Sequence, residues 1–283
     1  DGEASFERHQ QGQVSALVAD GRDATPDHVF NPTRVQLSPA DNLLEGNSLL
    51  YLGLKFLVKG QLEIGKSSSV STKLVFANTE LLAAIRKEWS PPKRSVAITF
   101  DDGWLDNWTW AFPVLVKYRL RAAVFVATGW VERASAGGAP VSPEAFPSHR
   151  EARRMAERGE CRGIVLDWDR IAEMRASGLV DFYSHTASHV PCDRLAPEAV
   201  SEELRVSKRV LEDRLGRPCP YLCWPFGKFS KETVALARET GYTALFTTRH
   251  DVVREKTDPS GIPRIVVKDR VDWFRRRVRV YSH

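Results

Sequence analysis

Residues 95–103 read Ser-Val-Ala-Ile-Thr-Phe-Asp-Asp-Gly, and this stretch decides how the rest of the chain is interpreted. Its first six residues are mainly apolar or β-branched, which is typical of a buried strand. Two carboxylates, Asp101 and Asp102, stand where that strand should end. Neighbouring ionised carboxylates repel each other, and burial raises the cost of keeping both charged. A bound cation would remove this cost, so the stretch indicates a metal site.

Predicted strands and helices alternate along the chain around this stretch. We expect strands at 96–100, 122–127, 179–183, 221–224, 242–247 and 262–267, and helices at 80–89, 107–119, 167–177, 197–215 and 230–240. Such alternation favours an α/β fold with a parallel sheet and crossover helices, arranged as a barrel or as an open doubly wound sheet.

Polar side chains follow three of these strands. Asp101 and Asp102 end one, His185 and His189 follow another in His-Thr-Ala-Ser-His, and residues 224–227 follow a third. The carboxyl ends of parallel strands meet at one edge, where sites are assembled. Histidines four residues apart can share a cation, and two imidazoles with one carboxylate form a zinc-type catalytic set. A metal lowers the pKa of a water that it binds, and a second carboxylate can take the proton.

Three motifs in this order resemble the polysaccharide deacetylase family, which is also called the NodB-homology domain or carbohydrate esterase family four. They are Thr-Phe-Asp-Asp-Gly at 99–103, His-Thr-Ala-Ser-His at 185–189 and Trp-Pro-Phe-Gly at 224–227. The resemblance covers roughly residues 80–268. It implies a distorted (β/α) barrel of about seven strands. It also implies metal-dependent hydrolysis of the acetamide of an N-acetylated sugar, in a polysaccharide or a glycan precursor.

The resemblance also implies a role for each motif residue. Asp101 corresponds to the catalytic base, and Asp102, His185 and His189 correspond to the metal ligands. Zn²⁺ is the metal expected first, although Co²⁺, Ni²⁺, Mn²⁺ and Fe²⁺ also accept such ligands.

The third motif is expected to form the substrate groove. Pro225, Phe226 and Gly227 resemble its wall, where the Phe226 N–H would help to hold an oxyanion. Trp224 offers an apolar face that can stack on a sugar ring, with ordinary core packing as the alternative.

Two family features are missing from the motifs. Many members carry an arginine two residues before the motif proline, which orients the catalytic aspartate, but Cys223 occupies that position here. The late Leu-x-His motif that supplies a proton donor also has no match, and His250 is a candidate substitute. A carbohydrate-binding homologue with impaired catalysis is therefore the main alternative function.

A nucleotide hydrolase is the second alternative. Residues 60–67 read Gly-Gln-Leu-Glu-Ile-Gly-Lys-Ser, which satisfies the spelling of a phosphate-binding loop. Such a loop must open a helix, whereas residues 67–76 favour a loop or a strand. A strand or loop at 67–78 would exclude this function.

Two regions are expected along the 283 residues. Residues 1–45 are polar and show no sustained period, so we assign 1–73 to an N-terminal arm and its flanking elements. Residues 74–283 are assigned to a deacetylase-like catalytic domain with a polar insertion near 131–163. An insertion of this length is often functional.

Composition limits the partners and the location. No apolar run is long enough to span a membrane, and four cysteines without a CxxC pair are expected as unpaired thiols near the core. Residues 264–283 hold seven Lys and Arg and two Asp, and this tail could touch an anionic partner weakly. The expected partner is an N-acetylated glycan, with no nucleic acid. The first residue is not Met, which a removed signal peptide and a trimmed sequence would explain equally well. A periplasmic or secreted location is slightly favoured, and a cytoplasmic one stays open.

Overall fold

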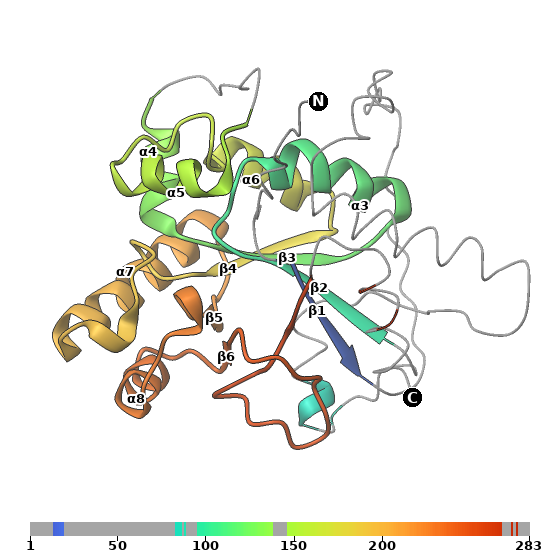
Figure 1. Ribbon diagram of the computed structural model, residues 1–283, viewed down its shortest axis with the longest axis vertical. Helices are drawn as coiled ribbons and strands as arrows, with labels where there is room; N and C mark the ends of the chain where they lie inside the picture. The colour runs from blue at the N-terminus through green and yellow to red at the C-terminus, as the bar shows by residue number, and fades with distance from the viewer. Residues whose placement is uncertain are drawn as a thin grey trace, which may run out of the picture.

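The computed structural model describes residues 83–86, 88, 95–137, 146–267, 273 and 276, together with the backbone of 14–19. In these residues the strands form one sheet in the order β6-β5-β4-β3-β2-β1-β7 (Figure 1). The strands are β1 Val14–Ala19, β2 Ser95–Phe100, β3 Ala122–Val126, β4 Val180–Ser184, β5 Tyr221–Cys223, β6 Ala244–Phe246 and β7 Ile265–Val266.

The central strands β2 to β6 run parallel, each beside the next. Every residue of β3 is buried, as are residues 96–100 of β2. Such continuous burial is expected where a parallel sheet is covered on both faces, and it explains why these strands are apolar without alternation. Because the strands are parallel, their carboxyl ends meet at one edge.

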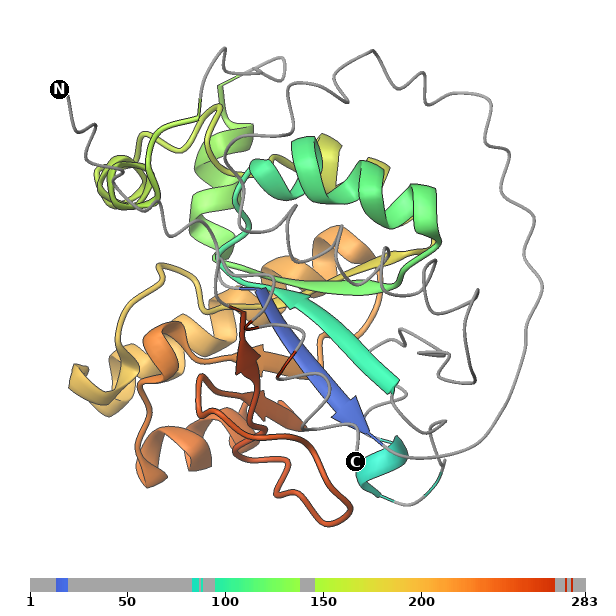
Figure 2. The ribbon, with the colours of Figure 1, turned by 45° about the vertical axis from the view of Figure 1, so that its right-hand side comes forward.

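The chain segment 262–266 closes the curved sheet. Ile262 forms a parallel bridge with Phe246 of β6, while Ile265 and Val266 pair with β1 in antiparallel register. Figure 2 shows β7 beside β1, which is blue. The segment therefore links the two ends of the sheet, and the predicted distorted (β/α) barrel is confirmed.

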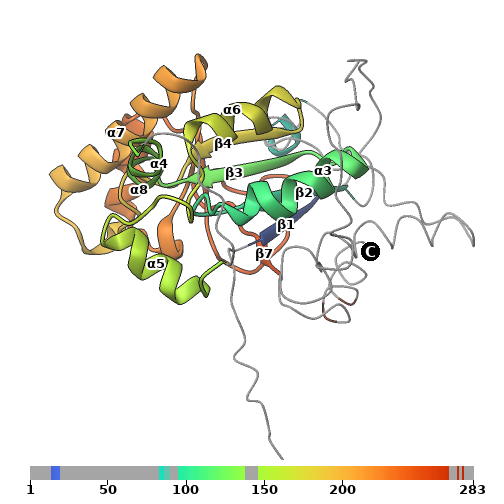
Figure 3. The same ribbon diagram turned by 90° about the horizontal axis from the view of Figure 1, so that it is seen from above.

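Helices cover the outside of this sheet. They are η3 Asn107–Ala111, α3 Phe112–Tyr118, α4 Thr128–Ser135, α5 His149–Glu157, α6 Trp168–Ala176, η4 Cys192–Arg194, α7 Pro197–Leu215, η5 Pro225–Gly227 and α8 Lys231–Glu239. Their ends follow local chemistry: the Asp167 and Ser230 side chains cap α6 and α8, and Gly216 ends α7 in the left-handed region. Seen from above, α5 lies at the same end of the molecule as α4, α7 and α8 (Figure 3).

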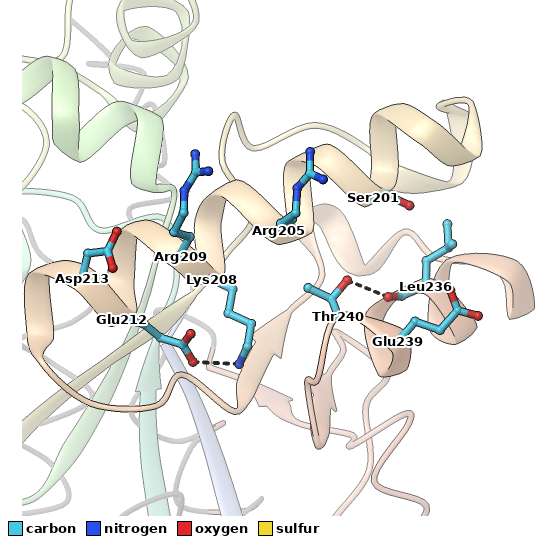
Figure 4. A pocket seen from close by; sticks show the side chains of 9 residues that line it. All are labelled: Ser201, Arg205, Lys208, Arg209, Glu212, Asp213, Leu236, Glu239 and Thr240. Carbon is cyan, nitrogen blue, oxygen red and sulfur yellow. Dashed lines mark hydrogen bonds and ion pairs between the residues drawn. The ribbon is translucent and has the colours of Figure 1, made fainter.

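The longest helix, α7, packs through one apolar stripe. Val200, Leu204, Leu211 and Leu215 are its buried apolar residues, at the spacing of one helical face. Its outer side forms a polar groove with α8 (Figure 4), where Lys208 Nζ lies 3.0 Å from Glu212 Oε1. None of the helices in the described part of the chain is long and apolar enough to cross a membrane.

The structure differs from the sequence-based predictions in two places. Residues 14–19 lie in the expected N-terminal arm, yet they form β1 and pair with β2 along its whole length. The insertion near 131–163 contains the end of α4 and all of α5. Residues 60–78, on which the nucleotide-hydrolase alternative depends, lie outside the described residues. The four cysteines are free and buried, as predicted.

Gly227 gives a test of the loop that follows β5. Its φ is +63°, and a Cβ there would overlap with Thr248 Oγ1. We expect Gly227→Ala to lower the free energy of unfolding by about 2–4 kcal/mol, because a left-handed backbone and overpacking both oppose the added methyl group. Urea denaturation measures the loss. Gly178→Ala is the matched control, since its φ is +70° but no atom lies within 4 Å of the added Cβ. An equal loss in both variants would contradict the overlap.

Candidate active site

The predicted metal ligands converge at the carboxyl ends of β2 and β4. Asp102 Oδ1 lies 3.1 Å from His185 Nε2 and 3.0 Å from His189 Nε2. All three side chains are buried, and one ligand atom from each lies within 4.8 Å of the others. Two imidazole nitrogens directed at one carboxylate oxygen are ligands that a divalent cation accepts, so these three residues could hold one.

Neighbouring groups orient the side chains of Asp102 and His185 and the backbone of His189. His185 Nδ1 lies 2.7 Å from the Cys223 carbonyl oxygen, so Nδ1 carries the proton and Nε2 is left to bind a cation. Asp102 Oδ2 accepts a hydrogen bond of 2.9 Å from Trp104 Nε1. The backbone N–H of His189 donates to Thr186 Oγ1 at 3.2 Å, which fixes the backbone of the histidine loop. The side chains of Asp102 and His185 are therefore held by groups outside the cluster, whereas His189 is positioned through its backbone.

Several non-glycine residues with a left-handed backbone lie at this site. Asp102, Thr186, His189 and Phe226 have φ values of 70°, 65°, 56° and 58°, although none of them is glycine. Left-handed backbone costs non-glycine residues about 1–2 kcal/mol each. Strained residues of this kind persist where the surrounding structure holds them in place, and they cluster at functional sites.

The electrostatic setting keeps Asp102 charged. Burial by itself raises the pKa of this carboxyl, but the charge of His189 and the close imidazoles of His149, His185 and His189 outweigh it. The pKa of Asp102 is consequently held well below its usual value. An ionised carboxylate is the form that binds a cation.

Asp101 has a different environment, although it is the next residue. Its Oδ1 lies 2.7 Å from Arg264 Nη1, and its Oδ2 lies 2.6 Å from Arg264 Nη2. Arg264 is fully buried, and its other hydrogen bonds go to Thr99 Oγ1, the Thr247 carbonyl oxygen and Cys223 Sγ. A buried carboxylate and a buried guanidinium joined by two hydrogen bonds balance each other's charge.

Sequence reasoning missed Arg264. The arginine expected near Asp101 was sought two residues before Pro225, where Cys223 stands. In the structure Arg264 Nη2 donates to Cys223 Sγ at 2.9 Å, so the guanidinium lies beside that position but comes from the residue before β7. The available signal was an arginine between apolar residues in the predicted strand 262–267, whereas we had counted it with the basic tail.

Arg264 also decides between two possible cation sites. Asp101, His185 and Cys223 form a second group of ligand atoms close enough for a metal. The Arg264 guanidinium already contacts both the Asp101 carboxylate and the Cys223 thiol, so a second cation there would be repelled. Burial raises the pKa of the Cys223 thiol, which further disfavours a thiolate ligand. This leaves Asp102, His185 and His189 as the candidate cation site.

The third motif forms an aromatic edge next to the cluster. Phe226 is 37% exposed, and its ring lies 4.7 Å from the His189 ring. Trp224 is completely buried and stacks against Phe229, which is 38% exposed. The prediction that Trp224 presents a face to a sugar ring is therefore wrong for this structure, and the core-packing alternative describes it. Phe226 and Phe229 are the accessible aromatic side chains.

Helix α5 of the insertion contributes two side chains that lie close to Asp102. His149 Nε2 and Arg153 Nη2 lie 3.7 Å and 3.9 Å from Asp102 Oδ2. The Arg153 guanidinium lies 4.9 Å from the centre of the Phe226 ring. The His250 ring lies 6.2 Å from the Trp273 ring, and His149 is a histidine outside the motifs that lies beside Asp102.

The fold and the site define a class of protein. It is an α/β barrel that gathers two carboxylates and two imidazoles at the carboxyl ends of its strands. A model of the polysaccharide deacetylase family matches residues 89–245, more than half of the chain. The chain belongs to the polysaccharide deacetylase family.

Individual relatives agree with this assignment. YxkH of Bacillus subtilis (strain 168), whose name assigns it provisionally to the polysaccharide deacetylases, is 25% identical over 164 residues, covering 58% of this chain and 48% of YxkH. The poly-beta-1,6-N-acetyl-D-glucosamine N-deacetylase of Staphylococcus epidermidis is 25% identical over 186 residues, covering 63% of this chain and 56% of that protein. The chain thus spans about half the length of these relatives.

Solved structures show the same fold. IcaB from Ammonifex degensii superposes with a TM-score of 0.63 at 23% identity, over 84% of this chain and 91% of IcaB. The Streptococcus pyogenes deacetylase PplD in complex with acetate gives a TM-score of 0.60 at 22% identity, over 84% of this chain and 87% of PplD. At this level of identity the likeness concerns the fold alone.

The Asp101–Arg264 pair predicts a measurable coupling. We expect Arg264→Met to lower the free energy of unfolding by about 3–5 kcal/mol, because it leaves the Asp101 carboxylate buried without its partner. Asp101→Asn should be costly for the same reason. The double variant should lose clearly less than the sum of the single losses, since it buries no unpaired charge. Urea denaturation of the four proteins measures this, and additive losses would show that the two side chains do not interact.

Asp106 predicts a pH dependence of stability. Burial raises the pKa of this carboxyl to about 6, against a hydrogen bond from Asn107 and the charge of His149. The folded protein therefore holds the proton more tightly than the unfolded chain. The contribution of this protonated carboxyl to the free energy of unfolding is complete below about pH 4, and it is lost as the pH rises through about 6. We expect Asp106→Asn to be more stable than the wild type at pH 8, by up to about 3 kcal/mol, and nearly equal at pH 4. Parallel pH profiles for the two proteins would contradict this.

Proposed function

We propose that this protein is a divalent-metal-dependent de-N-acetylase of N-acetylated sugars. The observation that carries the proposal is the separation of two adjacent carboxylates into different environments. Asp102 faces two imidazole nitrogens, whereas Asp101 is held by Arg264. One carboxylate is thus available to hold a cation and the other to move a proton, which is the division of roles that amide hydrolysis requires.

Asp102, His185 and His189 would hold the metal. When bound, the metal would act as a Lewis acid on the acetamide and would make water a better nucleophile at neutral pH. Zinc suits two imidazoles and one carboxylate, and Co²⁺, Ni²⁺, Mn²⁺ or Fe²⁺ are compatible with the same ligands.

The protein's own residues would carry the remaining steps. Asp101 would take a proton from the attacking water at one of its carboxylate oxygens, which keep free lone pairs beside the two hydrogen bonds from Arg264. Arg264 would fix the direction of that carboxylate and balance its charge. The Phe226 N–H would donate to the oxyanion that forms at the acetamide carbonyl.

A glycan is the proposed substrate. The family acts on carbohydrate, and the names of several relatives specify poly-beta-1,6-N-acetyl-D-glucosamine. The exposed Phe226 and Phe229 offer apolar faces of the kind that sugar rings contact. A cell-wall or surface polysaccharide, or its precursor, fits this description.

A binding protein without catalysis is less well supported. It was supported by the missing arginine at Cys223 and by the missing Leu-x-His proton donor. Arg264 supplies a guanidinium to the same carboxylate, so the first of these arguments no longer holds.

Acetate release from N-acetylglucosamine oligomers tests the proposal. The wild type should release acetate after Zn²⁺ or Co²⁺ is added and lose this activity in a chelator. Asp101→Asn should lower kcat by about 10²-fold or more, because the proton acceptor is gone. His189→Ala should bind the metal at least about tenfold more weakly, as measured by calorimetry.

A matched change on the same histidine loop is the control. Ser188→Ala replaces an exposed side chain one residue from His189 and should keep both activity and metal affinity. Full activity of Asp101→Asn would refute the assigned base, and unchanged metal affinity of His189→Ala would refute the ligand set.

A further inference from the structure

Arg153 is a cation at the mouth of the site that the proposed chemistry does not use. Its Nη2 lies 3.9 Å from Asp102 Oδ2, and its guanidinium lies 4.9 Å from the centre of the Phe226 ring. Its side chain is 28% exposed. It therefore lies against the exposed aromatic edge of the site, where a bound sugar would reach it.

Arg153 differs from Arg154 of α5 and from Arg158, which follows the end of that helix. Arg154 and Arg158 lie 3.7 Å and 3.6 Å from the Glu151 carboxylate, and Arg158 also pairs with Glu160 at 2.9 Å. Arg153 Nε is buried and has no hydrogen-bond partner among the described residues. A buried donor without a partner is costly, so this guanidinium keeps hydrogen-bonding capacity that the described residues do not use.

The balance of charge in the site favours an acidic ligand. The carboxylates of Asp101 and Asp102 are opposed by the guanidiniums of Arg264 and Arg153. A divalent cation between neutral histidines would leave the site with an excess of positive charge, and this holds even when the nearby Asp106 is ionised. An anionic group beside Arg153 would reduce that excess in a poorly solvated place.

We propose that Arg153 is a specificity-determining residue that binds a carboxylate of an acidic glycan, carried by the reacting N-acetylated sugar or its neighbour. This inference rests on the proposed function for the identity of the reacting group. The guanidinium, stacked on Phe226, donates hydrogen bonds to the carboxylate while the acetamide lies at Asp102 and the two histidines.

The test compares two forms of one oligosaccharide. The first alternates N-acetylglucosamine with glucuronate, and the second is the same molecule with its carboxyl groups reduced to alcohols. KM and kcat for acetate release are measured for the wild type, Arg153→Gln and Arg153→Lys. Arg150→Gln is the matched control, because Arg150 is exposed on the same helix and the variant removes the same charge.

A binding measurement separates recognition from turnover. Both oligosaccharides are prepared with methanesulfonamide in place of acetamide, which the enzyme cannot hydrolyse. Their dissociation constants are measured by calorimetry on the metal-loaded proteins. This readout depends on Arg153 even if no acetate is released.

We expect Arg153→Gln to raise KM and the dissociation constant for the acidic form by about fivefold to tenfold, and to change the reduced form less than about twofold. Arg153→Lys should lie between the wild type and Arg153→Gln, and Arg150→Gln should match the wild type. Equal effects of Arg153→Gln on both forms, or equal effects of Arg153→Gln and Arg150→Gln, would overturn the inference. Absence of acetate release from every N-acetylated glycan would instead refute the proposed function, and the binding comparison would still decide the role of Arg153.

Discussion

The buried ion pair between Asp101 and Arg264 is the interaction on which the rest of the structure depends. Asp101 directly follows β2, and Arg264 lies in the segment that joins β6 to β1. Neither charge is tolerable alone in a buried place, so closure of the barrel and completion of the site require each other. A protein that lost the closing segment would lose the partner of Asp101 as well as a strand.

The same pair explains how neighbouring carboxylates coexist. Asp102 has a left-handed backbone with φ of 70°, so the chain turns sharply between the two side chains and gives them different surroundings. Arg264 compensates the charge of Asp101, and the two imidazoles with Trp104 surround Asp102. Each of the two neighbouring carboxylates thus has its own compensating contacts, which reduces the cost of their mutual repulsion. The proposed roles of base and ligand follow from this difference in contacts.

The sequence predicted those parts of the molecule whose cause is local. The strands between 95 and 246 and the helices α3, α6, α7 and α8 follow from apolar runs, caps and glycines, and the histidine pair follows from spacing. The helices α4 and α5 were not predicted. It did not predict β1, because residues 14–19 become a strand only through pairing with β2. It placed Arg264 in a basic tail, since its partner lies 163 residues away. The buried face of Trp224 was also unpredictable, because the motif does not show which side the sheet covers.

The origin of Arg264 has a wider consequence for judging activity from motifs. What a buried base requires is a cation at hydrogen-bond distance, whichever strand supplies it. In a closed barrel, side chains from several strands reach the interior, so Cys223 can stand where an arginine is expected while the guanidinium arrives from the closing segment. A missing motif residue therefore argues against catalysis only when the interior of the barrel has no substitute. Here the substitute is present, and it contacts both the carboxylate and the side chain at the vacated position.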